Sequence, residues 1–411
     1  MPQTLILGST GSDVVLLQTT LNSCPPTALP LLLVDGSFGS VTLERIKEFQ
    51  SNNGLFVDGL VGPITWGKLL EEIPSQKQTF YAQGRHLFDR LGNQVILRGV
   101  NKMSVFDLDN DPAGTISFPE IRKTGANSVR IVWLIAYDNG TLTDHTILDA
   151  LITNAKQNHL IPMIDLHDAT GDWSKLPELI DYWIRPEIVN IIQKHQEYLL
   201  VNIANEAGGN DDQGNDLVSE AQFIEGYSKA IQMMRAAGIH TPLFIDASIL
   251  GKSLDRLDAT ATRLIDTDPE KNLLFSVHLY WGISDGADAN FIRSKLQNSV
   301  NLGYPLIVGE FSGYGAWAGM DENKMPKSVC SPDGRIDYKT IMEVCHQHEI
   351  GWYVWEWGPG NALGNPPDPL CVVMDMTPDR LFANLKSGWA EEVAISSPYS
   401  IKNTSVTPPT M

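Results

Sequence analysis

Two glutamates carry the clearest chemical signal in this sequence. Glu206 and Glu310 each lie at the C-terminal end of an apolar run rich in β-branched residues. Cleavage of a glycosidic bond needs one carboxylic acid to protonate the leaving oxygen and one carboxylate to act on the anomeric carbon. A separation of about 5 to 5.5 Å between them gives retention of configuration, and one of roughly 6.5 to 9.5 Å gives inversion. The two positions are far apart in the chain, so only the fold can bring them together.

Other polar residues end similar apolar runs. Asn205 directly precedes Glu206, and His278 and Tyr280 end the run before that of Glu310. The remaining members of this set are Asn101, Arg130, His167, Asp168 and Trp355. If the runs are parallel strands of a closed barrel, their C-terminal ends meet at one mouth.

Eight apolar runs are the predicted strands that must position these residues. The runs span 95–101, 128–133, 160–168, 199–206, 242–247, 274–281, 305–311 and 351–357. Most intervals have helical apolar spacing, as in 147–155 and 223–234. Alternating buried strands and helices predict an α/β fold, a (β/α)₈ TIM barrel over 79–395. A doubly wound open sheet would usually have a Gly-rich loop after its first strand, and Asn101-Lys102-Met103 stands there instead.

The N-terminal part of the chain has a separate pattern. Residues 34–42 (VDGSFGSVT) return in altered form as 57–65 (VDGLVGPIT), with apolar residues at helical spacing before and between the copies. This pattern predicts a small all-α, three-helix domain over 1–72. Residues 73–78 are polar, contain a Pro and indicate a linker. Residues 396–411 are rich in Ser, Thr and Pro without an apolar face, so a disordered tail is expected.

The first 72 residues also resemble a known module. The positions that carry the resemblance are Gly8, Gly11 to Val14, Leu17-Gln18, Leu21-Asn22, Asp35-Gly36, Phe38-Gly39, Phe49-Gln50, Gly54-Leu55, Asp58-Gly59, Gly62 and Thr65-Trp66. In this order they are similar to the peptidoglycan-binding domain-1 type. The resemblance implies attachment to a cell-wall glycan, and a stabilising appendage that no longer binds is the alternative.

Residues 79 to 390 resemble glycoside hydrolase family 5, in the cellulase clan. The motifs are Leu97-Arg98-Gly99-Val100-Asn101, His167-Asp168, Asn205-Glu206, His278-Leu279-Tyr280, Gly309-Glu310-Phe311 and Trp355. The resemblance implies that Glu206 is the acid/base and Glu310 the nucleophile of a retaining enzyme that needs no metal or cofactor. It further implies that Asn205 binds the sugar 2-OH and that Arg130 and Tyr280 orient Glu310 and keep it ionised.

The same resemblance assigns the rest of the site. His167 and His278 shape the −1 subsite, Trp355 is its stacking floor, and Asn101 is predicted to bind substrate with them. Each residue also has a structural interpretation: Arg130 as an ion-pair partner, and the histidines and Trp355 as core.

Segments around His167, Asp181-Tyr182-Trp183 and Trp355-Glu356-Trp357 look most like the β-mannanase branch of the family. Ala207 stands where Pro is usual, and Lys102-Met103-Ser104 where His-Pro is frequent. β-Mannan and β-glucan therefore both remain possible substrates of an endo-β-1,4-glycanase. A non-catalytic wall-anchored glycan-binding protein and a peptidoglycan-directed autolysin are the alternatives.

Composition narrows the partners. A net charge of −19 gives no electrostatic attraction to nucleic acid or to anionic lipid. No stretch is long and apolar enough to predict a membrane span. A classical signal peptide is not visible, yet the predicted module and polymer substrate favour a location outside the cytoplasm or at the cell wall. The four cysteines form no CxxC pair, and the group Cys345, His346, His348 and Glu349 is expected at a helix end as packing and surface residues.

Overall fold

A computed structural model describes residues 3–24, 29, 31–72, 77–137, 139–283, 286–315, 334–363 and 371–411. The chain divides into two compact units. The first comprises Met1–Gln78 with Arg90–Gly92, and the second Thr79–Asp89 with Asn93–Met411. Each unit has its own apolar core.

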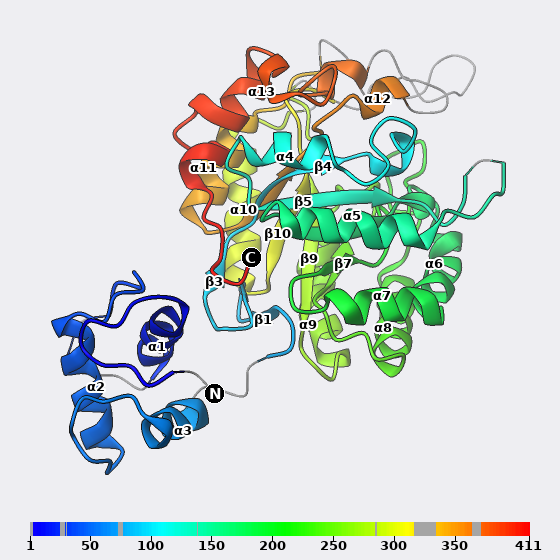
Figure 1. Cartoon of the computed structure of the whole chain (residues 1–411). Coiled ribbons are helices and arrows are strands. Elements are labelled where there is room, and N and C mark those ends of the chain that lie inside the picture. The colour runs from blue at the N-terminus through cyan, green and yellow to red at the C-terminus, as the bar shows by residue number, and fades with distance from the viewer. Residues whose placement is uncertain are drawn as a thin grey trace. The chain divides into compact units, whose positions relative to one another are not determined.

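The second unit contains a closed barrel of eight parallel strands in the order β10-β11-β4-β5-β6-β7-β8-β9. Figure 1 shows its strands inside a surround of helices. The predicted (β/α)₈ fold and all eight predicted strands are confirmed. The strands are β4 (Arg98–Lys102), β5 (Ser128–Trp133), β6 (Ile161–Leu166), β7 (Leu200–Asn202), β8 (Leu243–Asp246), β9 (Leu273–His278), β10 (Leu306–Glu310) and β11 (Gly351–Val354).

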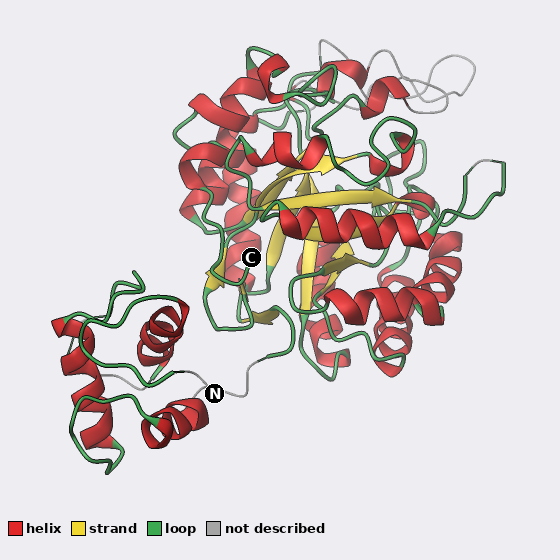
Figure 2. Cartoon of the chain, viewed as in Figure 1, coloured by secondary structure: helices red, strands yellow, loops and turns green. Residues whose placement is uncertain are grey.

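Helices alternate with these strands and surround them (Figure 2). The larger ones are α4 (Ser117–Arg122), α5 (His145–Gln157), α6 (Leu176–Trp183), α7 (Pro186–His195), α8 (Glu220–Ala236), α9 (Leu254–Thr267), α10 (Ala289–Leu302) and α11 (Tyr338–Gln347). Side-chain oxygens cap several N-termini, and Ser219 and Gln222 form a capping box at α8. Short elements complete the C-terminal part: α12 (Gly360–Leu363), η5 (Cys371–Met374), α13 (Trp389–Glu391) and α14 (Ile401–Thr404).

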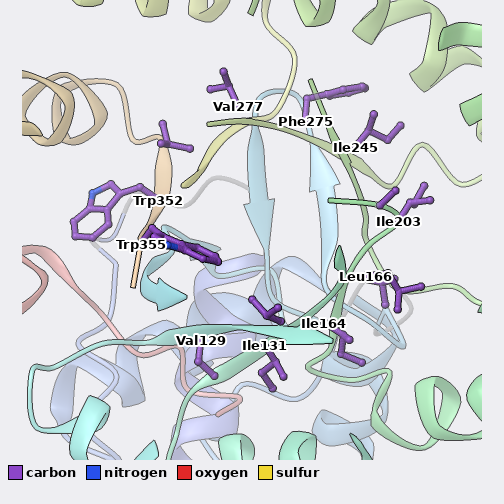
Figure 3. Close-up of a cluster of buried hydrophobic side chains, with 14 of the residues drawn as sticks. Val129, Ile131, Ile164, Leu166, Ile203, Ile245, Phe275, Val277, Trp352 and Trp355 are labelled. Atoms are coloured by element: carbon purple, nitrogen blue, oxygen red, sulfur yellow. The ribbon is translucent and has the colours of Figure 1, made fainter. Parts of the chain in front are cut away.

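The strands bury side chains on both of their faces, which explains their continuous apolar sequences. The outward-facing residues join the helices in one large core, of which Figure 3 shows a part that includes Val129 and Ile131 on β5. The inward-facing residues at the N-terminal end of the barrel form a second apolar cluster. Its strand members are Ile161, Met163, Leu200, Phe244, Leu274, Ile307 and Tyr353.

A small antiparallel sheet contributes to that second cluster. It consists of β1 (Tyr81–Gln83), β2 (His86–Phe88) and β3 (Gln94–Val95). Phe80, Leu87 and Val95 from this segment pack in the inner cluster. Asn272 fastens the segment by donating to the carbonyl oxygen of Phe80 and accepting from the backbone of Ala82. The hairpin therefore closes the barrel at the end opposite the strand C-termini.

The first unit is the expected three-helix domain, with α1 (Ser12–Ser23), α2 (Ser40–Asn52) and α3 (Pro63–Glu72). Its sequence repeat is also a repeat of hydrogen bonds. Gln18 donates to Asp35 and accepts from Gly36 N, each at 2.9 Å. Gln50 makes the same pair of bonds to Asp58 and to Gly59 N, again at 2.9 Å. Gly36 and Gly59 both have positive φ, which is why each Asp-Gly turn ends in glycine.

The C-terminal segment corrects the expectation of a disordered tail over 396–411. Ile401 is fully buried in α14, and Arg98 donates to Thr404 at 3.0 Å. Further along, Asn127 donates to the carbonyl oxygen of Val406 and Lys156 to that of Thr410. Polar side chains of the barrel hold this segment through its backbone, so it needs no apolar periodicity of its own.

The structure describes some of the cysteines and places the residues that were expected at a helix end. Cys345 is a buried free thiol in α11, and the thiol of Cys24 donates to the carbonyl oxygen of Thr20. Cys330 and the side chain of Cys371 lie outside the described residues. His346 is also in α11, with His348 and Glu349 directly after it. Among the described helices, none combines the length and apolar character needed to cross a membrane.

Candidate active site

The two glutamates reach the barrel mouth by different backbone routes. Glu310 is the last residue of β10, where the register against β9 shifts. Glu206 lies beyond the end of β7, in a left-handed conformation with φ 47°. Its backbone N–H donates to Oδ2 of Asp246 at 3.1 Å. Left-handed backbone is costly for a residue with a side chain and is typical of functional sites, and here Asp246 helps to hold it.

Each oxygen of Glu310 has a donor. Arg130 Nη1 donates to Oε1 and the Tyr280 hydroxyl to Oε2, both at 2.7 Å. The side chain of Glu310 is 4% exposed, so its charge is balanced by the guanidinium rather than by water. Two fixed donors orient the carboxylate.

Glu206 is in a different electrostatic setting. Its Oε1 lies 2.7 Å from Nδ1 of His278. Burial raises the pKa of Glu206, and the charge of Glu310 acts in the same direction, so together they outweigh the opposing effect of His278. Two carboxyl groups in one site whose environments differ in this way are suited to separate acid and nucleophile roles.

His278 connects the two glutamates. Its Nδ1 is 3.6 Å from Oε2 of Glu310, and its Nε2 is 3.5 Å from Oδ2 of Asp246. Burial alone would lower the pKa of His278, but the carboxylates of Glu310 and Asp246 outweigh it and raise the pKa to about 9. The ring is therefore an imidazolium at neutral pH.

The glutamates are close. One carboxylate oxygen from each and a ring nitrogen of His278 lie within 4.8 Å of one another. This spacing is in the range of retaining rather than inverting glycosidases.

Two further carboxylates, Asp165 and Asp246, were not predicted from the sequence. Arg130 Nη1 is 3.2 Å from Asp165 and Nη2 is 3.5 Å from Asp246, with all three side chains fully buried. Asp165 also binds Nδ1 of His167 at 3.0 Å. The available signal was the position of each aspartate inside an apolar strand, since an acidic residue there is buried only with a partner.

Asn101 and Asn205 complete the hydrogen bonding of Arg130. Nη1 donates to Oδ1 of Asn101 at 2.9 Å, and Nη2 to Oδ1 of Asn205 at 2.7 Å. Asn205 in turn donates to the hydroxyl of Thr170 at 2.9 Å. Every predicted site residue therefore lies at one mouth of the barrel. Trp355 contacts this group through the ring of His167, and the others are linked to Arg130, Glu206 or Glu310 directly or through one partner.

Exposure divides the predicted residues into two sets. Asn101, Arg130 and His278 are fully buried, so none of them can contact a sugar in this conformation. They contact Glu310, Glu206 or each other. Glu206, Glu310, His167 and Trp355 keep some exposed surface. The rings of His167 and Trp355 stack with centroids 5.7 Å apart, forming one wall beside the carboxylates.

The model of "Cellulase (glycosyl hydrolase family 5)" matches residues 89–361. The chain belongs to glycosyl hydrolase family 5. A "Mannan endo-1,4-beta-mannosidase" of Cellvibrio japonicus is 31% identical over 338 residues, which cover 79% of this chain and 70% of the relative. The mannohexaose complex of Thermomonospora fusca β-mannanase has a TM-score of 0.64 at 29% identity and covers 80% of this chain and 98% of its own. As a family 5 protein, the chain is a glycoside hydrolase of the retaining, endo-acting type.

The first unit has its own relatives. The model "Putative peptidoglycan binding domain" matches residues 10–69 of this family 5 chain. A "Zinc D-Ala-D-Ala carboxypeptidase" of Streptomyces albus G is 40% identical over 68 residues, which cover 16% of this chain and 26% of that relative. The likeness to that carboxypeptidase therefore extends to about the length of the module.

Proposed function

We propose that this chain hydrolyses β-1,4-mannan, with Glu310 as nucleophile and Glu206 as acid/base. The observation that carries the assignment of roles is the asymmetry of the two glutamates. Glu310 accepts from Arg130 and Tyr280, whereas Glu206 is next to a cationic ring yet keeps a raised pKa. Mannan is favoured over β-glucan because the relative from Cellvibrio japonicus and the structure from Thermomonospora fusca are both named as mannan-cleaving enzymes.

The reaction has two steps. Glu310 attacks the anomeric carbon and forms an ester, while the bond to the leaving sugar breaks and its oxygen takes the proton of Glu206. Glu206, now a carboxylate, removes a proton from a water that attacks the same carbon and releases Glu310. Esterification removes the charge of Glu310, one of the causes of the raised pKa of Glu206. The pKa of Glu206 should therefore fall once the ester has formed. Glu206 then stays a carboxylate, as its role as base in the second step requires.

We also propose roles around this pair. His167 and Trp355 form the wall on which the −1 sugar stacks, since both keep exposed surface beside the carboxylates. Asn205 donates to the sugar 2-OH with the amide hydrogen not used by Thr170. Arg130, Asn101 and His278 set the positions and charges of the two glutamates.

A panel of polymers tests the substrate. Reducing ends released from β-mannan, β-glucan, cellulose and purified peptidoglycan would be measured with the whole chain. Mannan is expected to be cleaved with the highest kcat/KM. Preference for β-glucan would contradict the mannan assignment, and preference for peptidoglycan would favour the autolysin hypothesis.

The first unit supports a location at the cell wall or outside the cell. We propose that it holds the enzyme on peptidoglycan, as its match to a peptidoglycan-binding model suggests. Co-sedimentation of the whole chain with insoluble peptidoglycan, compared with insoluble mannan, tests this. Binding to peptidoglycan in the presence of excess soluble mannan supports an anchor separate from the barrel, and its absence supports a stabilising appendage.

A further inference from the structure

A second pair of buried carboxyl groups begins with the residue that follows Trp355. Glu356 directly follows Trp355 and is fully buried, and Asp375, just after η5, is 1% exposed. Neither is used by the two-step reaction. Buried acids without a cationic partner of their own are rare in proteins and are usually functional.

Glu356 joins two loops at the barrel mouth. Its Oε2 accepts from the backbone N–H of Met103, in the loop after β4, at 3.1 Å. Its Oε1 accepts from the backbone N–H of Asn361, in α12, also at 3.1 Å. Asp375 Oδ1 accepts from the side chain of Asn361 at 2.5 Å. The loops after β4 and β11 thus meet on these two acids.

Two glycines leave space for the side chains of this pair. A Cβ on Gly360 would lie 2.3 Å from Oε1 of Glu356, and one on Gly358 would lie 2.8 Å from Cβ of Asp375. The other oxygen of Asp375, Oδ2, is buried and has no hydrogen-bond partner within the described part of the chain. The backbone N–H of Asn361 lies 3.1 Å from Oε1 of Glu356 and 3.4 Å from Oδ1 of Asp375, so the two acids meet at one residue. A proton held between them would give Oδ2 of Asp375 the partner that it lacks.

The charged groups facing the pair do not neutralise it. Lys102 on β4 forms an ion pair with Asp107 at 2.7 Å, and Arg380 binds the same aspartate. Lys386 donates to the carbonyl oxygen of Val372 at 2.7 Å. Burial and the adjacent Asp375 raise the pKa of Glu356 well above its usual range, and burial also raises the pKa of Asp375. Both directions favour a proton held by the pair.

The pair is connected to the catalytic wall through the backbone. Glu356 N donates to the carbonyl oxygen of Met374 and Met376 N to that of Glu356. Trp355 N donates to the carbonyl oxygen of Phe311, the residue after Glu310, at 2.7 Å. A displacement of Glu356 would therefore move the ring of Trp355 relative to the nucleophile.

We propose that Glu356 and Asp375 share one proton and act as a positioning pair, which fixes Trp355 for sugar binding and releases it when the shared proton is lost. The role of Trp355 in this inference rests on the proposed function. The pair itself does not, and the experiment has one readout that needs no sugar.

The first readout is ¹⁹F NMR of the whole chain labelled with 5-fluorotryptophan, from pH 5 to pH 10. The Trp355 signal is assigned by its loss in Trp355→Phe. In the parent it is expected to shift at alkaline pH. In Glu356→Gln, whose amide can donate to Asp375 at every pH, the shift should become smaller, and what remains comes from His167, which stacks on Trp355 and has a raised pKa, and from His278. Glu178→Gln, an exposed glutamate on α6, serves as the matched control and should titrate like the parent. A shift that is identical in Glu356→Gln and the parent would overturn the proposal.

The second readout is the Kd of mannohexaose in the Glu206→Gln background, which prevents turnover and removes the titration of Glu206. Affinity is expected to fall at alkaline pH with Glu356 present and to change less when Glu356→Gln is added. His278 titrates equally in both chains and cancels in this comparison. Glu356→Ala should weaken binding by about tenfold at pH 6, the loss of one aromatic contact, and unchanged affinity would overturn the proposal. Failure of the parent to bind mannohexaose would count against the mannan assignment alone, because the NMR readout would still decide the pair.

Discussion

Two layers of side chains fill the same barrel and differ in what they do. Met163 and Asp165 are two residues apart on β6, as are Phe244 and Asp246 on β8, and all four are buried. Residues two apart in a strand face the same side. The first member of each pair belongs to the apolar cluster near the β1–β3 hairpin, and the second binds Arg130. One step along a strand therefore separates the layer that stabilises the barrel from the layer that arranges its chemistry.

The two glutamates proposed as catalytic should show this separation most strongly. Glu310→Ala is expected to lower kcat on the cleaved polymer by roughly 10⁴-fold or more, because no other group can form the ester. Glu206→Ala should cost roughly 10² to 10⁴-fold. Glu310→Ala also takes a buried partner from Arg130 and should lower the free energy of unfolding by about 3 kcal/mol. This cost is far smaller than the loss of kcat, and the barrel should stay folded at the assay temperature. Steady-state kinetics and urea unfolding of both variants, with Glu349→Ala as an exposed control, would measure this. Full activity in either variant would show that the polar layer does not carry the chemistry.

The apolar layer should respond in the opposite way. Phe244→Ala is expected to lower the free energy of unfolding by about 3 to 5 kcal/mol through lost burial and the cavity that remains. The kcat measured well below the melting temperature should stay close to that of the parent. Leu302→Ala, at an exposed position on α10, should change stability little. A large loss of kcat with preserved stability in Phe244→Ala would show that the layers are not separate.

A change at Asp165 should affect both activity and stability. Asp165→Asn removes a charge from Arg130 and His167, so we expect lower kcat and a stability loss of about 3 kcal/mol. Burial alone would raise the pKa of Asp165, but Arg130 outweighs it and lowers the pKa. The stabilisation from its charge is then present at neutral pH and lost as the pH falls through the folded-state pKa. The stability difference between parent and variant should accordingly shrink towards low pH, whereas Asp266→Asn, at an exposed site, should show no such trend.

The smallest predicted effect is a shift in a pH profile. The charge of His278 lowers the pKa of Glu206, against the larger effect of burial. His278→Gln removes that charge, so the pKa of Glu206 should rise. Activity requires protonated Glu206, hence the alkaline limb of kcat/KM should move to higher pH. His240→Gln, at an exposed histidine, is the control. A limb that moves to lower pH would contradict the electrostatic role of His278.

Much of this arrangement was predictable because buried parallel strands leave continuous apolar runs in a sequence. All eight strands were found in this way, and Glu206 and Glu310 followed from their places at strand ends. The order of the C-terminal segment was not predicted, because hydrogen bonds from Asn127 and Lys156 to its backbone hold it and leave no apolar pattern in the sequence. Asp165 and Asp246 were missed because they lie inside strands, and the pair Glu356 and Asp375 because nothing in the sequence reveals that two distant acids share one site.

Trapping the covalent intermediate tests the central claim most directly. A mannosyl substrate with fluorine at C2 and an activated leaving group should form the ester quickly and hydrolyse it slowly, because the fluorine destabilises the oxocarbenium-like transition state. After proteolysis, mass spectrometry is expected to find one sugar on the peptide that contains Glu310, and none in Glu310→Ala. A sugar attached to Glu206, or inverted product released with no ester on the protein, would contradict the assignment of the two glutamates.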